Sequence, residues 1–192
     1  SPFPIVRLLY SAVVAVCVWF VLSRILNVVP KAVDAFRSNQ LAPYISALAS
    51  SDRNKASALF DHDLRASKSD PGAYELIATA CMQAKRYDLA IEYLNRGINE
   101  CRGAPKEVQA ELYKGLCECY AETEKSRPQT QAILAAKHAL DLVPDSVIYL
   151  NLYGYVLADN NLQLDEALGL IGRALQLLKK APEGPDTQFN IA

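Results

Sequence analysis

Apolar residues recur along most of this chain at the three- and four-residue spacing of amphipathic helices, and they do so in pairs of short segments. The pattern is plainest over residues 71–98, where one stripe is followed by a second: first Tyr74, Ile77, Ala78 and Cys81, then Tyr87, Ala90, Leu94, Gly97 and Ile98. Two helices this short cannot bury both stripes alone, so the pair must stack on similar pairs. The sequence therefore predicts an all-α fold of stacked helix pairs.

The same spacing returns twice further along the chain. The second copy comprises Tyr113, Leu116, Cys117, Tyr120, Ala132, Ala136, Ala139 and Leu140, and the third comprises Leu150, Tyr153, Gly154, Leu157, Ala167, Ile171, Ala174 and Leu175. The intervals within these copies predict an enlarged turn over residues 122–130 and a slightly long turn over residues 159–164. A long connector is expected over residues 101–105.

In each copy a small residue recurs where a larger one would be expected on an apolar stripe. This pattern resembles the tetratricopeptide repeat (TPR), whose small residues mark the close crossing of two helices, and the third copy is similar to bacterial members of that family. The resemblance covers residues 71–178 and implies an α-α superhelix of about three repeats, at about 71–104, 110–144 and 147–181, within a domain spanning 70–192. Residues 186–192 resemble the start of a further helix, either a cap or the continuation of a longer protein. A helical bundle with accidental spacing is the alternative.

Residues 31–69 precede these copies and show a weaker form of the pattern. They predict a connector and a degenerate leading helix pair that caps the stack. A helix starting at Pro43 would carry Tyr44, Ile45 and Leu48, and a helix over residues 54–65 would carry Ala56, Leu59, Phe60 and Leu64.

The segment Leu8–Leu22 is apolar without interruption by charge and predicts a single membrane-spanning helix within an anchor of residues 1–30. Sixteen residues separate Arg7 from Arg24, or about 24 Å of helix against a hydrocarbon core about 30 Å thick, so both arginines would reach outward to the interface. The residues expected to contact lipid are Leu8, Val14, Val18, Trp19 and Leu22. A cleaved signal peptide and a buried core helix are the alternatives, although no small-residue cleavage site follows Leu22.

Basic residues near this segment are more frequent after it than before it. Arg7 precedes the segment, whereas Arg24, Lys31 and Arg37 follow it. The positive-inside rule therefore predicts that the large carboxyl-terminal part lies in the cytoplasm, with a periplasmic location as the alternative. Five scattered cysteines fit a reducing compartment and are expected to be packing residues.

Composition and motifs exclude several function classes. The chain carries a net charge of −1, and no basic stripe for a nucleic acid is evident. His62 and His138 lack neighbours at metal-ligand spacing, so both are expected on helix surfaces, and the isolated Gly154 and Gly169 are expected to be packing glycines. The sequence predicts no catalytic residues, no metal site and no cofactor.

The TPR resemblance implies a groove lined by the first helix of each repeat. The residues that it places there are Glu75, Thr79, Met82, Lys114, Glu118, Asn151, Tyr155 and Asp159. Glu75 and Glu118 stand where some family members use cations to grip a carboxylate, which disfavours that ligand. Each of these residues is otherwise an ordinary surface position.

These observations favour a non-catalytic, membrane-anchored protein–protein interaction scaffold that assembles or stabilises a membrane protein complex. Its partners would be other proteins and, through the anchor, lipid. Two alternatives remain: a periplasmic or secreted TPR adaptor for envelope or export machinery, with the apolar segment as export signal, and a regulatory module of an enzyme whose chemistry lies elsewhere.

Overall fold

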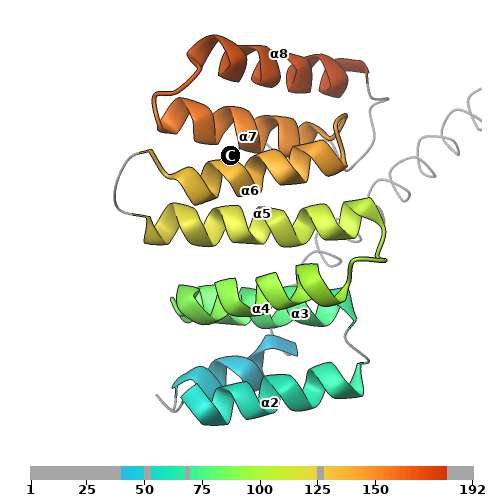
Figure 1. The fold of residues 1–192 in the computed structure, drawn as a ribbon, viewed down its shortest axis with the longest axis vertical. Coiled ribbons are helices and arrows are strands. Elements are labelled where there is room, and N and C mark those ends of the chain that lie inside the picture. The colour runs from blue at the N-terminus through green and yellow to red at the C-terminus, as the bar shows by residue number, and fades with distance from the viewer. Residues whose placement is uncertain (1–39, 50–52, 68–69, 125–127, 181–192) are drawn as a thin grey trace, which may run out of the picture. The chain divides into compact units, whose positions relative to one another are not determined.

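The computed structural model describes residues 40–49, 53–67, 70–124 and 128–180, and all regular secondary structure in these ranges is helical (Figure 1). The chain divides into two compact units, Ser1–Pro43 and Tyr44–Ala192. The predicted membrane segment Leu8–Leu22, its lipid-facing residues and the predicted helix start at residues 186–192 lie outside the described ranges. Within those ranges, none of the helices combines the length and apolar character needed to cross a bilayer.

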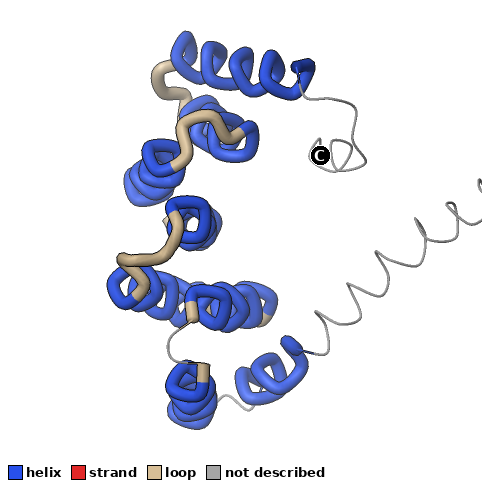
Figure 2. Tube along the Cα trace, turned by 90° about the vertical axis from the view of Figure 1, so that its right-hand side faces the viewer, coloured by secondary structure: helices blue, strands red, loops and turns tan. Residues whose placement is uncertain are grey.

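The second unit is a series of antiparallel helix pairs. Its helices are α2 (Arg53–Ala66), α3 (Pro71–Gln83), α4 (Tyr87–Glu100), α5 (Lys106–Thr123), α6 (Thr130–Leu142), α7 (Val147–Asp159) and α8 (Leu164–Lys180), preceded by a helical segment ending at residue 49. The pairs α3/α4, α5/α6 and α7/α8 each pack together, and α4 contacts α5 as α6 contacts α7 (Figures 1 and 2). This arrangement agrees with the predicted stack of repeats, with α5 starting four residues before the position expected for the second copy.

The turns inside the pairs occur where the repeat spacing predicts them. The α3/α4 turn contains Lys85 with φ 56°, and the α7/α8 turn contains Asn161 and Gln163 with φ 55° and 45°. These left-handed residues reverse the chain within a few positions. Two of the first helices begin at a side-chain cap, since Asp70 accepts a hydrogen bond from the Gly72 amide and Ser146 accepts one from the Tyr149 amide.

Small residues lie where the helices of a pair meet. Ala90, Ala132 and Ala167 each lie near the start of the second helix of their pair, and each is at most 1% exposed. A Cβ atom added to Gly154 would lie 2.9 Å from Ile171 Cγ1 and 3.1 Å from the Ala167 carbonyl oxygen. The helices therefore approach too closely for a larger side chain, which confirms the predicted role of the small positions.

Two predictions for α8 are wrong. Gly169 was expected to be a packing glycine, but a Cβ atom there would meet nothing within 4 Å. Leu175 was expected on the apolar stripe, but its side chain is 51% exposed. Both residues lie on the side of the last described helix that faces away from α7, whereas Ala167 and Ala174 form the buried side.

The leading helix pair packs on α4 through aromatic rings. The rings of Tyr44 and Tyr93 each meet the ring of Phe60 edge to face, with centroids 5.4 Å and 5.2 Å away. Leu48 and Leu64 are buried as predicted. The predicted capping pair is therefore part of the stack.

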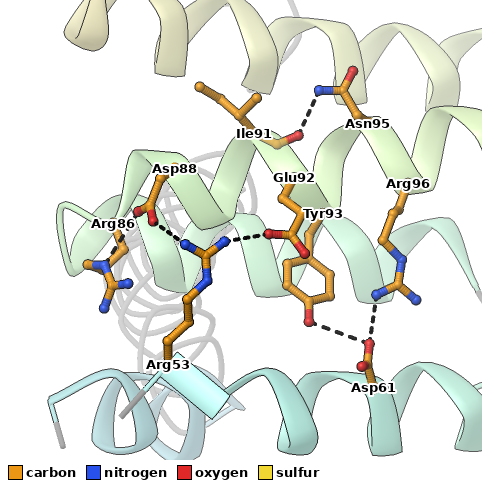
Figure 3. A network of polar contacts seen from close by, with 9 residues as sticks. All are labelled: Arg53, Asp61, Arg86, Asp88, Ile91, Glu92, Tyr93, Asn95 and Arg96. Atoms are coloured by element: carbon orange, nitrogen blue, oxygen red, sulfur yellow. Dashed lines mark hydrogen bonds and ion pairs between the residues drawn. The ribbon is translucent and has the colours of Figure 1, made fainter. Parts of the chain in front are cut away.

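Ion pairs on the surface reinforce the contact between α2 and α4 (Figure 3). Arg96 donates to Asp61 at 2.7 Å, and the Tyr93 hydroxyl donates to the same carboxylate at 3.4 Å. Near the start of α2, Arg53 donates to Asp88 at 3.1 Å and to Glu92 at 2.7 Å (Figure 3). These groups are largely accessible to water, so each pair contributes about 1 kcal/mol at most.

A buried polar cluster joins the ends of α5 and α7 to the start of α6. The backbone amide of Gln129 donates to Asn160 Oδ1 at 2.6 Å, and its side-chain Nε2 donates to the Ala121 carbonyl at 2.8 Å. Asn160 in turn donates to the Val156 carbonyl at 2.8 Å. The Glu124 carboxylate caps α6 by accepting from the amides of its first residues, at 3.1–3.2 Å. The enlarged turn predicted here is thus held in a fixed arrangement at both of its described ends.

Candidate partner-binding surface

The residues predicted to meet a partner lie on the first helices of the three pairs, and we call this set the first-helix face. It comprises Glu75, Thr79 and Met82 on α3, Lys114 and Glu118 on α5, and Asn151, Tyr155 and Asp159 on α7. None of these side chains is buried; Thr79, Met82 and Lys114 are half-buried and the others are exposed. Glu75, Lys114 and Asn151 occupy equivalent positions in the first helices of the three repeats. Thr79, Glu118 and Tyr155 occupy a second set of equivalent positions.

A single cation lies among three carboxylates where α3 and α5 contribute to this face. Lys114 Nζ donates to Glu111 Oε2 at 3.0 Å. Burial alone would lower the pKa of Lys114, but the hydrogen bond to Glu111 and the charges of Glu118 and Glu75 raise it overall. Lys114 is therefore held in its charged form.

Lys114 does not fully neutralise the negative charge of the carboxylates near it. Although the Glu118 side chain is exposed at the surface, protein atoms around its carboxyl group partly desolvate it and raise its pKa; Lys114 opposes that rise, and Glu111 and Glu75 add to it. Three acids from α3 and α5 thus share one internal cation, and the charged form of Glu118 is disfavoured in the isolated chain. A second cation brought by a partner would relieve this repulsion.

Glu111 and Tyr149 also belong to this part of the surface, although the sequence reasoning did not select them. The Tyr149 hydroxyl donates to Glu111 Oε1 at 2.7 Å and so connects α7 to α5. Burial, followed by this hydrogen bond, raises the pKa of Tyr149, so the phenol remains a donor. Glu111 precedes Lys114 by three positions, a spacing that could have revealed the ion pair, whereas nothing local marks the contact with Tyr149.

The α7 part of the face has a different character from the acidic part. Tyr155 is 62% exposed, which is unusual for a large aromatic side chain. The structure brings Glu75, Lys114 and Glu118 together, whereas Tyr155, Asn151 and Asp159 extend the face along α7. Whether these side chains bind a partner stays a prediction.

The reactive residue types of the described ranges lie away from this face or are inert. Cys81, Cys117 and Cys119 are buried, and burial raises the pKa of each thiol to about 12, which suits packing residues. His62 is exposed and contacts Asp63, and the His138 ring lies 5.2 Å from the ring of Tyr113. No group of three or more His, Cys, Asp or Glu residues in the part that the structure describes could hold a metal ion.

Solved structures of similar fold are known. A crystal structure of MamA aligns with a TM-score of 0.54 at 20% identity, covering 79% of this chain and 84% of that one. A MamA structure from Desulfovibrio magneticus, comprising residue 41 to the end, aligns with a TM-score of 0.53 at 20% identity, covering 77% and 78%. A thermophilic TPR protein from Thermus thermophilus is more distant, with a TM-score of 0.47, 21% identity and coverage of 73% and 74%.

These similarities concern the fold alone. No family model matches the sequence. No curated protein is similar to it at a significant level. Together with the small residues at the helix crossings, the likeness to MamA shows a TPR-like α-solenoid fold.

Proposed function

We propose that this chain is a non-catalytic, membrane-anchored scaffold that assembles or stabilises a membrane protein complex by binding a basic segment of a partner protein. A TPR-like stack supports binding because its repeated helices expose one continuous series of side chains. The observation that carries the proposal is the acidic group on the first-helix face, in which Lys114 pairs with Glu111 at 3.0 Å and the charges of Glu75 and Glu118 also act on it.

The chemistry of the partner follows from this charge arrangement. A lysine or arginine entering beside Glu118 would offset a carboxylate whose charged form is disfavoured in the free protein. Tyr155 would provide an aromatic contact on α7, since exposed tyrosines are enriched among residues that dominate interface energies. A partner segment with a cation next to an apolar residue fits both features.

The membrane part of the proposal rests on the apolar run Leu8–Leu22 and the basic residues that follow it. An anchor would confine the first-helix face near the bilayer and raise its effective concentration toward membrane-bound partners. We place the large carboxyl-terminal part on the cytoplasmic side. Protease protection in intact cells tests this, since digestion of the repeat domain from the outer side would contradict it.

Affinity capture of the full chain in mild detergent, followed by mass spectrometry, tests the scaffold role. The wild-type chain is expected to retain subunits of a membrane complex, and the Glu75→Lys/Glu118→Lys variant to lose them through charge repulsion. The matched control is Asp141→Lys/Glu166→Lys, which reverses two exposed acids on the second helices α6 and α8. Circular dichroism checks that both variants fold.

Two outcomes would contradict the proposal. One is a wild-type chain that purifies without any other protein. The other is equal loss of partners in the first-helix variant and in its control, because binding would then not depend on this face.

A further inference from the structure

The last described helix, α8, exposes an apolar stripe that we call the α8 outer stripe, defined by Leu164, Leu168, Gly172 and Leu175. Leu164, Leu168 and Leu175 are 48%, 70% and 51% exposed. Their spacing of four and seven residues places them on one side of the helix. The opposite side packs on α7, and α8 is the last helix of the described stack (Figures 1 and 2). Large apolar side chains grouped in this way mark an interface rather than ordinary surface.

Gly172 lies within this stripe, and no packing among the residues that the structure describes requires a glycine there. A Cβ atom added there would meet nothing within 4 Å. A glycine in a helix interior costs about 1 kcal/mol relative to alanine. At Gly154 the close approach of α8 to α7 explains a glycine, whereas no described residue approaches Gly172. Close approach by a helix from outside the chain would explain it.

Opposite charges stand at the two ends of the same side of α8. Asp165 lies in the first turn and Lys179 in the last turn. Lys179 follows Asp165 by fourteen positions, or about 21 Å along the helix, so the two cannot pair within one chain. The midpoint between the two positions is Gly172. An antiparallel copy of the same helix, related by a two-fold axis at Gly172, would therefore place each Asp165 opposite Lys179 of the other copy.

We propose that α8 is a self-association surface on which two copies of this chain pair antiparallel, with Gly172 at the crossing. The three leucines become buried between the helices, and two Asp165–Lys179 ion pairs close the ends. A single helix-to-helix contact is small for a protein interface, so the dimer is weak and depends on concentration. Dimerisation presents two first-helix faces in one particle, which increases avidity for a repeated or dimeric partner.

This inference stands apart from the proposed partner of the first-helix face. The α8 outer stripe and the acidic group lie on different helices, and the first-helix variants leave α8 unchanged. A failed partner capture and a failed self-association are therefore separate results.

Disulfide cross-linking of the full chain in mild detergent tests the pairing. In a Cys17→Ser background, Gly172→Cys places a thiol beside the two-fold axis, where it is expected to form a covalent dimer under mild oxidation. The matched control is Gly103→Cys, which also enters open space but lies in the α4/α5 connector. We expect the dimer at position 172 to form at least tenfold faster than at position 103.

Labelling with a maleimide under reducing conditions separates the ways in which cross-linking could fail. Fast labelling without a dimer would show an open surface that does not self-associate. Slow labelling without a dimer would show that another segment of the same chain covers α8. Either result overturns the proposal.

A charge exchange tests the antiparallel register without using a thiol. Asp165→Lys alone creates two Lys–Lys contacts in the dimer, and Lys179→Asp alone creates two Asp–Asp contacts, so each variant is expected to self-associate more weakly. A mixture of the two variants restores an oppositely charged pair at both ends. Co-capture of differently tagged chains should return to the wild-type level in the mixture, and failure to recover would overturn the register.

Discussion

The two ends of the described helical stack differ in the side chains that they expose to water. At the α2 end, Phe60 is fully buried between two aromatic rings, and the accessible surface carries ion pairs such as Arg96–Asp61. At the α8 end, Leu164, Leu168 and Leu175 remain exposed. The comparison shows that the leading helices bury their large aromatic side chains against one another and against α4, whereas α8 leaves three leucines exposed among the described residues.

The largest expected difference in stability is between a variant that removes a buried aromatic ring at the α2 end and one that removes an exposed leucine at the α8 end. Phe60→Ala removes a fully buried ring and should lower the free energy of unfolding by about 3–5 kcal/mol. Leu168→Ala, at a side chain 70% exposed, should change it by less than about 0.5 kcal/mol in dilute protein. Denaturant unfolding measures both, and similar losses would remove the distinction between the two ends.

Substitution in the buried Gln129–Asn160 cluster should lower the stability of the fold almost as much. Asn160→Ala removes the side-chain oxygen that accepts from the buried Gln129 backbone amide and should lower the free energy of unfolding by about 1–3 kcal/mol. Asn99→Ala is the control, because Asn99 is exposed on α4, where it donates to the Asn95 carbonyl and accepts from Arg102; its loss should lower the free energy of unfolding by less than about 0.5 kcal/mol. Equal midpoints in thermal unfolding would show that the cluster does not hold the enlarged turn.

Substitution by alanine should change the free energy of unfolding in opposite directions at Gly154, which lies between α7 and α8, and at Gly169, which lies on the open side of α8. Gly154→Ala forces a Cβ against Ile171 and the Ala167 carbonyl, and overpacking of this kind costs about 1–3 kcal/mol. Gly169→Ala enters open space and should stabilise the helix by up to about 1 kcal/mol. Stabilisation by both substitutions, measured in urea, would contradict the close helix crossing.

The smallest effect is expected at Glu118, away from both ends. Its pKa is raised in the folded chain, so the folded state is penalised once the pH exceeds the ordinary value for a glutamate. Glu118→Gln should therefore raise the unfolding midpoint modestly at neutral pH, with no gain under acid conditions where the carboxyl is protonated in both states. A gain that is independent of pH would show that charge is not its cause.

The sequence predicted the repeated part of the fold because small and large apolar residues alternate there at helical spacing. Ala90 and Gly154 could be placed at crossings on this basis, and the leading pair followed from Phe60 and Leu64. The Gln129–Asn160 cluster could not be predicted, since it joins residues 31 positions apart that carry no periodic pattern. Periodicity also misplaced Leu175 and Gly169, because it shows that a helix has an apolar side and not whether a neighbour covers it.

The candidate site was predicted only in part, for a related reason. Repeat equivalence selected Glu75, Lys114 and Glu118, which the structure places within electrostatic reach of one another. The contact of Tyr149 with Glu111 depends on the offset between α5 and α7, which is set by packing and not by local spacing.

Site-specific photo-cross-linking tests the central claim, binding of a partner through the first-helix face, most directly. A photoreactive phenylalanine analogue would replace Tyr155, which is 62% exposed on α7, and separately Leu134, which is 45% exposed on the second helix α6. Illumination of cells is expected to join a partner protein to the chain at position 155 and not at position 134. A partner joined only at position 134, or equally at both positions, would contradict the account.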